Sequence, residues 1–184
     1  GDMVTLTIGS EYADDDDFEV RGASGDVCLR YFAFGPLKNL TFQLNLCAAD
    51  PEAHALMIGE TTLESGEAVG FRWPEIGVGQ GCSGGTYYGV SLEVWTRSVG
   101  SDGSLDPTFP YLRWLFPKTF WRVADKNIEN APMAHNFTGF GIENDQWLDG
   151  PANDWPVLSD RSGQWLPVAT APTPACGYAS VSSS

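Results

Sequence analysis

Hydrophobic and polar residues alternate along several short stretches of the chain, which is the pattern of half-buried β-strands. These stretches are residues 4–8, 27–34, 39–47, 87–96, 109–123 and 134–140, with a weaker one at residues 165–169. Residues 67–73 form a further candidate strand that runs into Pro74. Turn-forming residues separate the stretches, so the pattern predicts a mainly β chain.

Residues 27–47 predict a β-hairpin with Gly35-Pro36-Leu37-Lys38 as its turn. A register symmetric about the Leu37–Lys38 bond gives one apolar face, with the pairs Leu29–Leu46, Tyr31–Leu44 and Ala33–Phe42. The same register makes Cys28 and Cys47 neighbours, either as a cross-strand disulfide or as free thiols.

One short helix is predicted directly after this hairpin. Asp50 can cap it, Pro51 suits its first turn and Gly59 ends it. Its apolar side is expected to consist of Ala53, Leu56 and Met57.

Several short strands with one helix favour a β-sandwich or barrel with a short flanking α-helix. Residues 1–143 are expected to form this β domain. Residues 144–184 are rich in Pro, Gly, Asp and Trp, and they predict a long irregular C-terminal arm. Because its tryptophans are costly to leave in water, the C-terminal arm is expected to pack on the same or a neighbouring subunit.

Acidic side chains dominate the charge of the chain, with 24 Asp and Glu against 10 Lys and Arg and a net charge of −14. Such a surface repels phosphate and anionic lipid. No apolar run approaches the roughly 20 residues that cross a bilayer. Tight binding to nucleic acid or membrane is therefore not expected. Asp14 to Asp17 lack the spacing of a calcium loop, so we expect a solvated loop there.

Gly81-Cys82-Ser83-Gly84-Gly85 matches the G-x-S-x-G motif of α/β hydrolases, but a strand and a helix do not flank it. A flexible loop is therefore favoured over a Ser83 nucleophile with His135 as its base. His54 is expected at the surface or its boundary, and the two histidines lack metal-site spacing. No catalytic, cofactor-binding or metal-binding residue is predicted, and the chain is not expected to be an enzyme.

Three stretches resemble the major tail protein, or tail tube protein, of long-tailed, siphovirus-type bacteriophages. The first is Leu40-Thr41-Phe42-Gln43-Leu44 with the following Cys47, Asp50-Pro51 and Ile58-Gly59, and the second is residues 89–95 with residues 111–118. The third consists of Ile128-Glu129-Asn130, Phe137-Thr138-Gly139, Glu143-Asn144 and Gly150-Pro151-Ala152-Asn153-Asp154-Trp155-Pro156. This family starts further upstream, so an N-terminal piece is expected to be missing or very short here.

The resemblance implies a structural virion protein that self-assembles into stacked rings of six subunits. The rings would form the phage tail tube, an acidic channel through which DNA is ejected without specific binding. The implied partners are copies of the chain and the terminator, tape measure and distal tail proteins. The protein would be made in the bacterial host cytoplasm and located in the virion tail, with no active site and no cofactor.

Two groups of residues are assigned to the tube on this basis. Candidate residues of the lumen and inner sheet are Arg30, Thr41, Gln43, Asn45 and Glu93. Candidate inter-subunit residues are Cys82, Tyr87, Trp147, Trp155 and Trp165.

Three other functions stay open. The first is another phage structural protein, either a head decoration protein or a head–tail connector. The second is a secreted β-sandwich that binds carbohydrate through exposed tryptophans and carries disulfides. The third is a serine hydrolase that uses Ser83.

Overall fold

The computed structural model describes residues 3–21, 23–46, 51–66, 68–71, 73, 89–124, 135–144, 147 and 160–170. Within these residues the protein is mainly β and has one short α-helix, as predicted. The elements are β1 (Met3–Tyr12), β2 (Asp16–Arg21), β3 (Val27–Ala33), β4 (Leu37–Leu46), α1 (Pro51–Ile58), β5 (Thr62–Ser65), β6 (Ala68–Phe71), β7 (Val90–Arg97), β8 (Tyr111–Val123), β9 (His135–Ile142) and β10 (Gln164–Val168).

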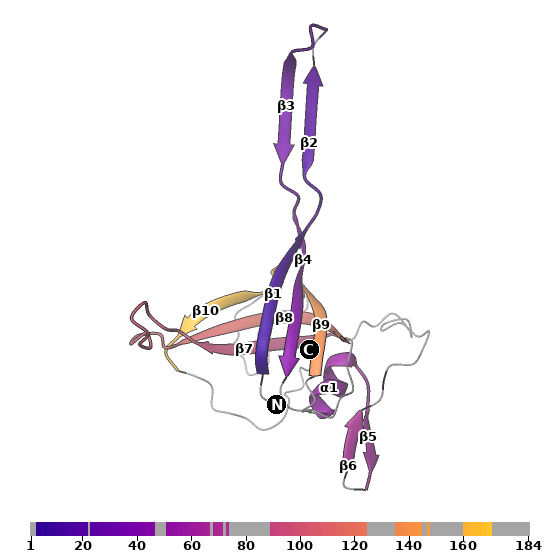
Figure 1. Ribbon diagram of the computed structural model, residues 1–184, viewed down its shortest axis with the longest axis vertical. Helices are drawn as coiled ribbons and strands as arrows, with labels where there is room; N and C mark the ends of the chain where they lie inside the picture. Colours follow the sequence, from indigo (N-terminus) through magenta and orange to yellow (C-terminus); the bar gives the residue numbers. More distant parts are fainter. Residues whose placement is uncertain are drawn as a thin grey trace.

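The body of the molecule is a six-stranded antiparallel sheet curled into a half-barrel (Figure 1). The strand order is β1-β4-β9-β8-β10, and β7 also pairs with β8. Two small hairpins, β2–β3 and β5–β6, lie outside this sheet. The alternating stretches at 87–96, 109–123, 134–140 and 165–169 all become strands of the main sheet, which confirms those predictions.

One face of the sheet forms the hydrophobic core. Phe42, Leu44 and Leu46 alternate along β4 and are buried, whereas Thr41 and Gln43 between them are exposed. The Phe42 ring packs at 4.9 Å from Phe116 and 5.6 Å from Trp121, measured between ring centroids. Phe137 of β9 and Ile58 of α1 complete this cluster.

The helix begins at Pro51 and Gly59 follows its end with φ 73°, as the sequence predicts. Its buried residues are His54, Ala55 and Ile58, however, and the expected apolar side of Ala53, Leu56 and Met57 is only half-buried. The surface position expected of His54 is also wrong. Its ring lies 4.9 Å from the Phe137 ring and 5.7 Å from the His135 ring, because α1 packs against the sheet on this side.

The predicted hairpin of residues 27–47 is wrong in its pairing. β3 pairs with β2, and β4 pairs with β1 and β9. Leu29 therefore lies opposite Val20, and Leu46 lies opposite Met3 and His135. The segment that carries Gly35 interrupts a longer ribbon, whose true turn lies between β2 and β3. Cys28 is an exposed free thiol far out on this ribbon, and Cys47 lies outside the described residues.

Two smaller predictions hold in part. The stretch 67–73 contains β6, which pairs with β5 through a turn that includes Gly66 at φ 65°. The four aspartates are exposed as expected, but Asp16 and Asp17 are the first residues of β2 rather than a loop.

We expect Phe42→Ala to lower the free energy of unfolding by about 3–5 kcal/mol, because it opens a cavity beside the rings of Phe116 and Trp121. Urea denaturation followed by tryptophan fluorescence measures the loss. Thr41→Ala is the matched control, since the neighbouring Thr41 side chain is exposed, and it should change stability by less than about 0.5 kcal/mol. Equal losses in both variants would contradict the assignment of the core face.

Candidate functional site: an amphipathic β-hairpin arm

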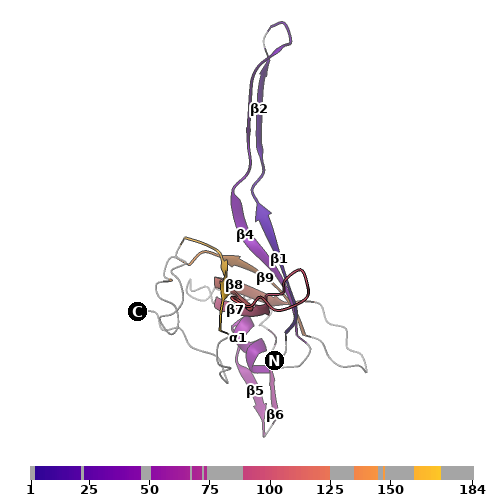
Figure 2. The same cartoon turned by 90° about the vertical axis from the view of Figure 1, so that its left-hand side faces the viewer.

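The most conspicuous feature of the surface is a long two-stranded ribbon that projects from the body (Figures 1 and 2). We call residues 13–36 the arm; it contains β2, β3 and the segments that join them to β1 and β4. The arm continues the β1–β4 pair outward, but β2 and β3 form a separate sheet of two strands. Such a ribbon is marginally stable by itself in water.

One face of the arm is apolar. The register places Phe18 opposite Tyr31 and Val20 opposite Leu29, and directly opposite residues share a face of an antiparallel pair. We call these four residues the apolar face. Their exposed fractions are 57% for Phe18, 39% for Val20, 57% for Leu29 and 56% for Tyr31. A cluster of this kind on a soluble surface marks an interaction site.

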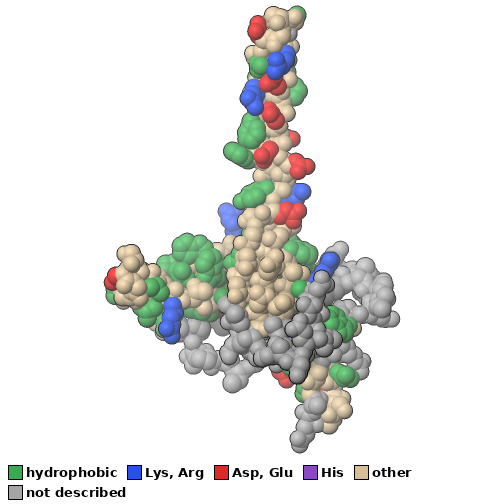
Figure 3. Space-filling view, viewed as in Figure 1, with side chains coloured by type: hydrophobic (Ala, Val, Ile, Leu, Met, Phe, Trp, Pro, Cys, Tyr) green, Lys and Arg blue, Asp and Glu red, His purple; other side chains and the backbone are tan. Residues whose placement is uncertain are grey.

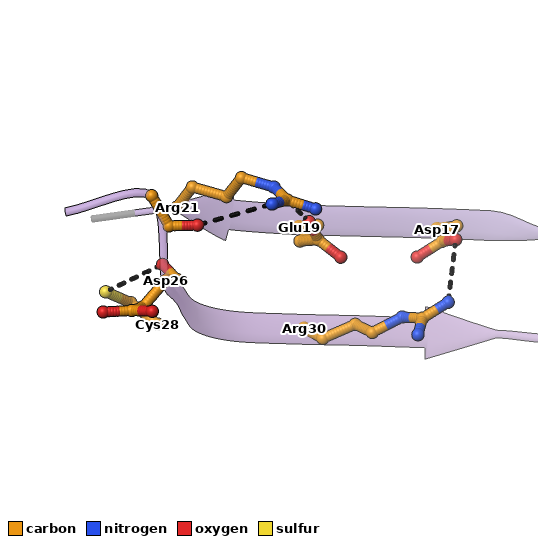
Figure 4. Close-up of polar contacts among 7 residues, drawn as sticks. Asp17, Glu19, Arg21, Asp26, Cys28 and Arg30 are labelled. Carbon is orange, nitrogen blue, oxygen red and sulfur yellow. Dashed lines mark hydrogen bonds and ion pairs between the residues drawn. The ribbon is translucent and has the colours of Figure 1, made fainter. Parts of the chain in front are cut away.

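The other face of the arm carries charges (Figure 4). Arg30 pairs with Asp17 at 3.5 Å between Nη2 and Oδ2, and Arg21 pairs with Glu19 at 2.7 Å between Nε and Oε1. The Arg21 guanidinium also donates a hydrogen bond to the Gly25 carbonyl. Exposed ion pairs add little stability. This face also carries Phe32, which lies opposite Asp17, is 50% exposed and packs edge-on against the Phe34 ring at 5.0 Å.

Where the arm leaves the body, the two segments of the ribbon cross close to each other. The Ala13 amide donates a 2.8 Å hydrogen bond to the Pro36 carbonyl, and the Gly35 amide donates one of 2.8 Å to Asp15 Oδ1. A Cβ atom at Gly35 would overlap the carbonyl oxygen of Ala13. An open pocket of about 530 Å³ lies at this crossing, lined by Tyr12, Ala13, Asp14, Asp15, Phe34 and Gly35.

The structure brings together three of the five candidate lumen residues. Thr41, Gln43 and Asn45 alternate along β4 and point away from the core. In register beside Gln43 lie Thr7 of β1 and Thr138 of β9, and Thr138 in turn lies opposite Arg122 of β8. We call this surface of β4, β9 and β8 the polar face.

The polar face has an unexpected charge for so acidic a chain. Strands β4, β8 and β9 contain no Asp or Glu, although they contain Lys38, Lys118 and Arg122. Acidic side chains instead lie along the arm. In Figure 3 the middle of the body, below the arm, shows no acidic side chains. Among the residues that the structure describes, the acidic side chains are therefore unevenly distributed.

The remaining two lumen candidates lie elsewhere. Arg30 is on the arm. Glu93 of β7 accepts a 2.7 Å hydrogen bond from Nε of the buried Arg113 and one of 2.9 Å from Trp95 Nε1. The Arg113 guanidinium also lies over the Trp95 ring, at 5.4 Å from its centroid. These contacts place Glu93 in a structural network of the sheet.

The five candidate inter-subunit residues have different positions. Trp165 is exposed on β10, whereas Trp147 is buried against Leu115 in a second small cluster of the body. Cys82, Tyr87 and Trp155 lie outside the described residues. β10 joins the main sheet through β8, and the division of the chain at residue 144 stays a prediction.

Comparison with known proteins adds no family. No protein-family model matches the chain, and no curated protein does. The described residues contain no helix long and apolar enough to cross a membrane, and no group of three or more His, Cys, Asp and Glu that could hold a metal ion. The tail tube resemblance therefore remains a prediction.

Gly35→Ala is expected to open the crossing at the root of the arm, because the new methyl group would overlap the Ala13 carbonyl. The Ala13 amide should then exchange its hydrogen roughly tenfold faster, consistent with the upper value of about 1.5 kcal/mol for one lost hydrogen bond. Hydrogen exchange measured by NMR tests this. Gly70→Ala is the control, since its Cβ would meet only ordinary contacts. Unchanged exchange at Ala13 in Gly35→Ala would refute the close crossing.

Proposed function

We propose that the protein is a structural virion protein that self-assembles through its arm, and that it forms the tail tube of a long-tailed bacteriophage. In this proposal, rings of six subunits stack into a hollow tube through which DNA is ejected. This proposal rests on the apolar face of the arm. The arm holds this face away from the body, so the body does not cover it. Such a surface is best explained by a second protein chain that buries it.

The size of the apolar face favours an assembly with many contacts. Full burial of a large apolar side chain contributes about 1.5–3 kcal/mol. The four side chains are roughly half exposed, so about 4 kcal/mol per arm can still be gained. That is less than, or close to, the cost of bringing two molecules together. A closed ring or stack, in which every subunit engages several arms at once, overcomes this cost through effective concentration.

The polar face suits the wall of a DNA channel. It presents the hydroxyl and amide side chains of Thr41, Gln43 and Thr138. The same face also carries the stacked rings of Phe120 and Phe140 and two cations, Lys118 and Arg122. Neutral polar groups release few counterions from DNA and therefore bind it weakly. A lumen lined by this face would be neutral to weakly basic rather than acidic. It would still let DNA slide, because phosphates would meet few fixed cations.

Of the other candidate functions, two have less support and one shares the evidence of the arm. A head decoration protein or connector would use the same arm, and only its location in the virion separates it from a tube protein. A secreted carbohydrate-binding protein predicts disulfides, whereas Cys28 is a free thiol. A hydrolase needs an accessible base, whereas His135 is buried beside His54.

We expect the purified protein to form rings or hollow tubes that negative-stain electron microscopy reveals. The double variant Phe18→Ser with Tyr31→Ser should stay monomeric in sedimentation velocity, because it removes half of the apolar face. Its unfolding midpoint should not fall, since these side chains lie on the separate arm.

Glu19→Gln, on the charged face of the same strand, is the control and should assemble like the native chain. A native protein that stays monomeric at every concentration tested would sink the proposal. Closed shells, or binding to capsids instead of tails, would favour the decoration protein.

A further inference from the structure

The polar face carries an aromatic pair that has no part in the proposed self-assembly. Phe120 of β8 lies opposite Phe140 of β9, and their rings are stacked with centroids 4.9 Å apart and planes 24° from parallel. Phe140 is 39% exposed, although an aromatic ring gains free energy when another group covers it. A preformed ring pair that reaches solvent suits a ligand that is itself planar and aromatic.

Two cations flank the ring pair along β8. Lys118, Phe120 and Arg122 are alternate residues of the strand and therefore share one of its faces. At about 3.3 Å per residue, each cation lies roughly 7 Å along the strand from Phe120. Lys118 Nζ lies 5.8 Å from the centroid of the Phe120 ring, and Arg122 is exposed. A cation, a ring and a second cation therefore follow one another along one face of β8.

Small residues border the ring pair on both sides. On the β4 side, Phe140 lies opposite Thr41, and Thr41 lies opposite Gly9 of β1. On the β7 side, a Cβ atom at Gly89 would lie 3.4 Å from Phe120 Cε1, and glycine leaves this position open. At these three positions, no bulky side chain stands between the rings and a ligand.

The strands around the ring pair carry no carboxylate, since β4, β8 and β9 contain no Asp or Glu. β1, at the border of the polar face, carries Glu11, which accepts a 3.2 Å hydrogen bond from the Asn39 amide. β1 is three strands away from β8, which is roughly 14 Å and exceeds the Debye length of about 8 Å at physiological salt. Glu143 comes one residue after Ile142, the partner of Lys118. Arg122, at the other end of this stretch, is therefore the stronger phosphate contact.

We propose that this part of the polar face binds single-stranded nucleic acid. We call it the stacking site; it consists of Lys118, Phe120, Arg122 and Phe140. A base would stack on the Phe140 ring, and the two cations would contact phosphates. Aromatic rings beside cations are the general means by which proteins hold single strands without sequence preference. The hydroxyl of Thr41, opposite Phe140, can form a hydrogen bond at the edge of the base.

A single strand fits the stacking site better than a duplex. The bases of a duplex are stacked on one another, whereas a single strand can splay a base onto an aromatic ring. Two cations release few counterions, so binding should be weak and should fall as salt rises. Passage of duplex DNA through the proposed tube is therefore compatible with capture of a single strand. All four residues belong to one subunit, so this function goes beyond the proposed tube and does not depend on it.

Fluorescence anisotropy with a labelled oligothymidylate at low salt tests the stacking site. The native chain and the Phe18→Ser, Tyr31→Ser double variant should both bind the strand, and the same strand in a duplex should bind more weakly. Phe140→Thr should weaken binding at least about fivefold, because it removes a stacking ring. Phe109→Thr is the matched control, since Phe109 is 42% exposed but lies in the loop between β7 and β8. It should leave the affinity unchanged.

The salt dependence of binding reports the phosphate contacts. Arg122→Gln should reduce the slope of log K against log salt concentration by about 0.7, the value for one phosphate of a single strand. Arg161→Gln removes the same charge from a residue that pairs with Asp160 before β10, so it should leave the slope unchanged. Circular dichroism checks that each variant is folded, and the exposed Arg122 provides a test even if Phe140→Thr does not fold.

Two results would overturn the stacking site while leaving the tube proposal intact. One is a native chain that does not bind the single strand at low salt, or that binds it no better than Phe140→Thr does. The other is a Phe140→Thr variant that no longer self-assembles while neither chain binds the strand, because the polar face would then be a contact between proteins. Conversely, a chain that binds the strand but forms no tube would overturn the tube proposal alone.

Discussion

The sheet depends on one irregularity in its longest strand, the bulge at Pro117 of β8. Proline lacks the N–H that a central strand needs, and it is tolerated at a bulge. The register with β7 shifts here, from Leu92 opposite Phe116 to Val90 opposite Thr119. The Pro117 carbonyl, released from regular pairing, accepts a 3.0 Å hydrogen bond from Ser91 Oγ. β8 can thereby pair with β10 before the bulge and with β9 after it, although these two parts of the sheet are oriented differently.

The consequences of this bulge reach the core and the surface. Phe116 before it and Trp121 after it lie an odd number of residues apart, which would put them on opposite faces of a regular strand; both belong to the main core. Leu115 points the other way, into the cluster with Trp147. Residues 111–115 pair with β10, and residues 118–123 pair with β9. The Trp114–Trp165 pair and the polar face therefore lie on two segments of the same strand.

The sequence predicts the body far better than the arm. Alternation along β4 correctly separates the buried Phe42 from the exposed Gln43, because that pattern depends only on one covered face. The sequence pattern does not predict the arm, because Gly35-Pro36 has the composition of a turn. In addition, the four consecutive aspartates at residues 14–17 give no alternating pattern at the start of β2. Arg30 was assigned to the inner sheet for the same reason. The burial of His54 depends on Phe137 and His135 from a distant strand, and no local pattern reveals such contacts.

The large net charge of the chain affects when its copies associate. A chain of net charge −14 repels its copies over distances of about 8 Å, the Debye length at physiological salt. The apolar face of one arm offers only a few kcal/mol against this repulsion. This opposition between repulsion and apolar burial suppresses isolated pairs and favours assemblies in which many contacts form together. An exposed apolar ribbon is an aggregation hazard, and the acidic residues beside it reduce that hazard until a complementary surface is available.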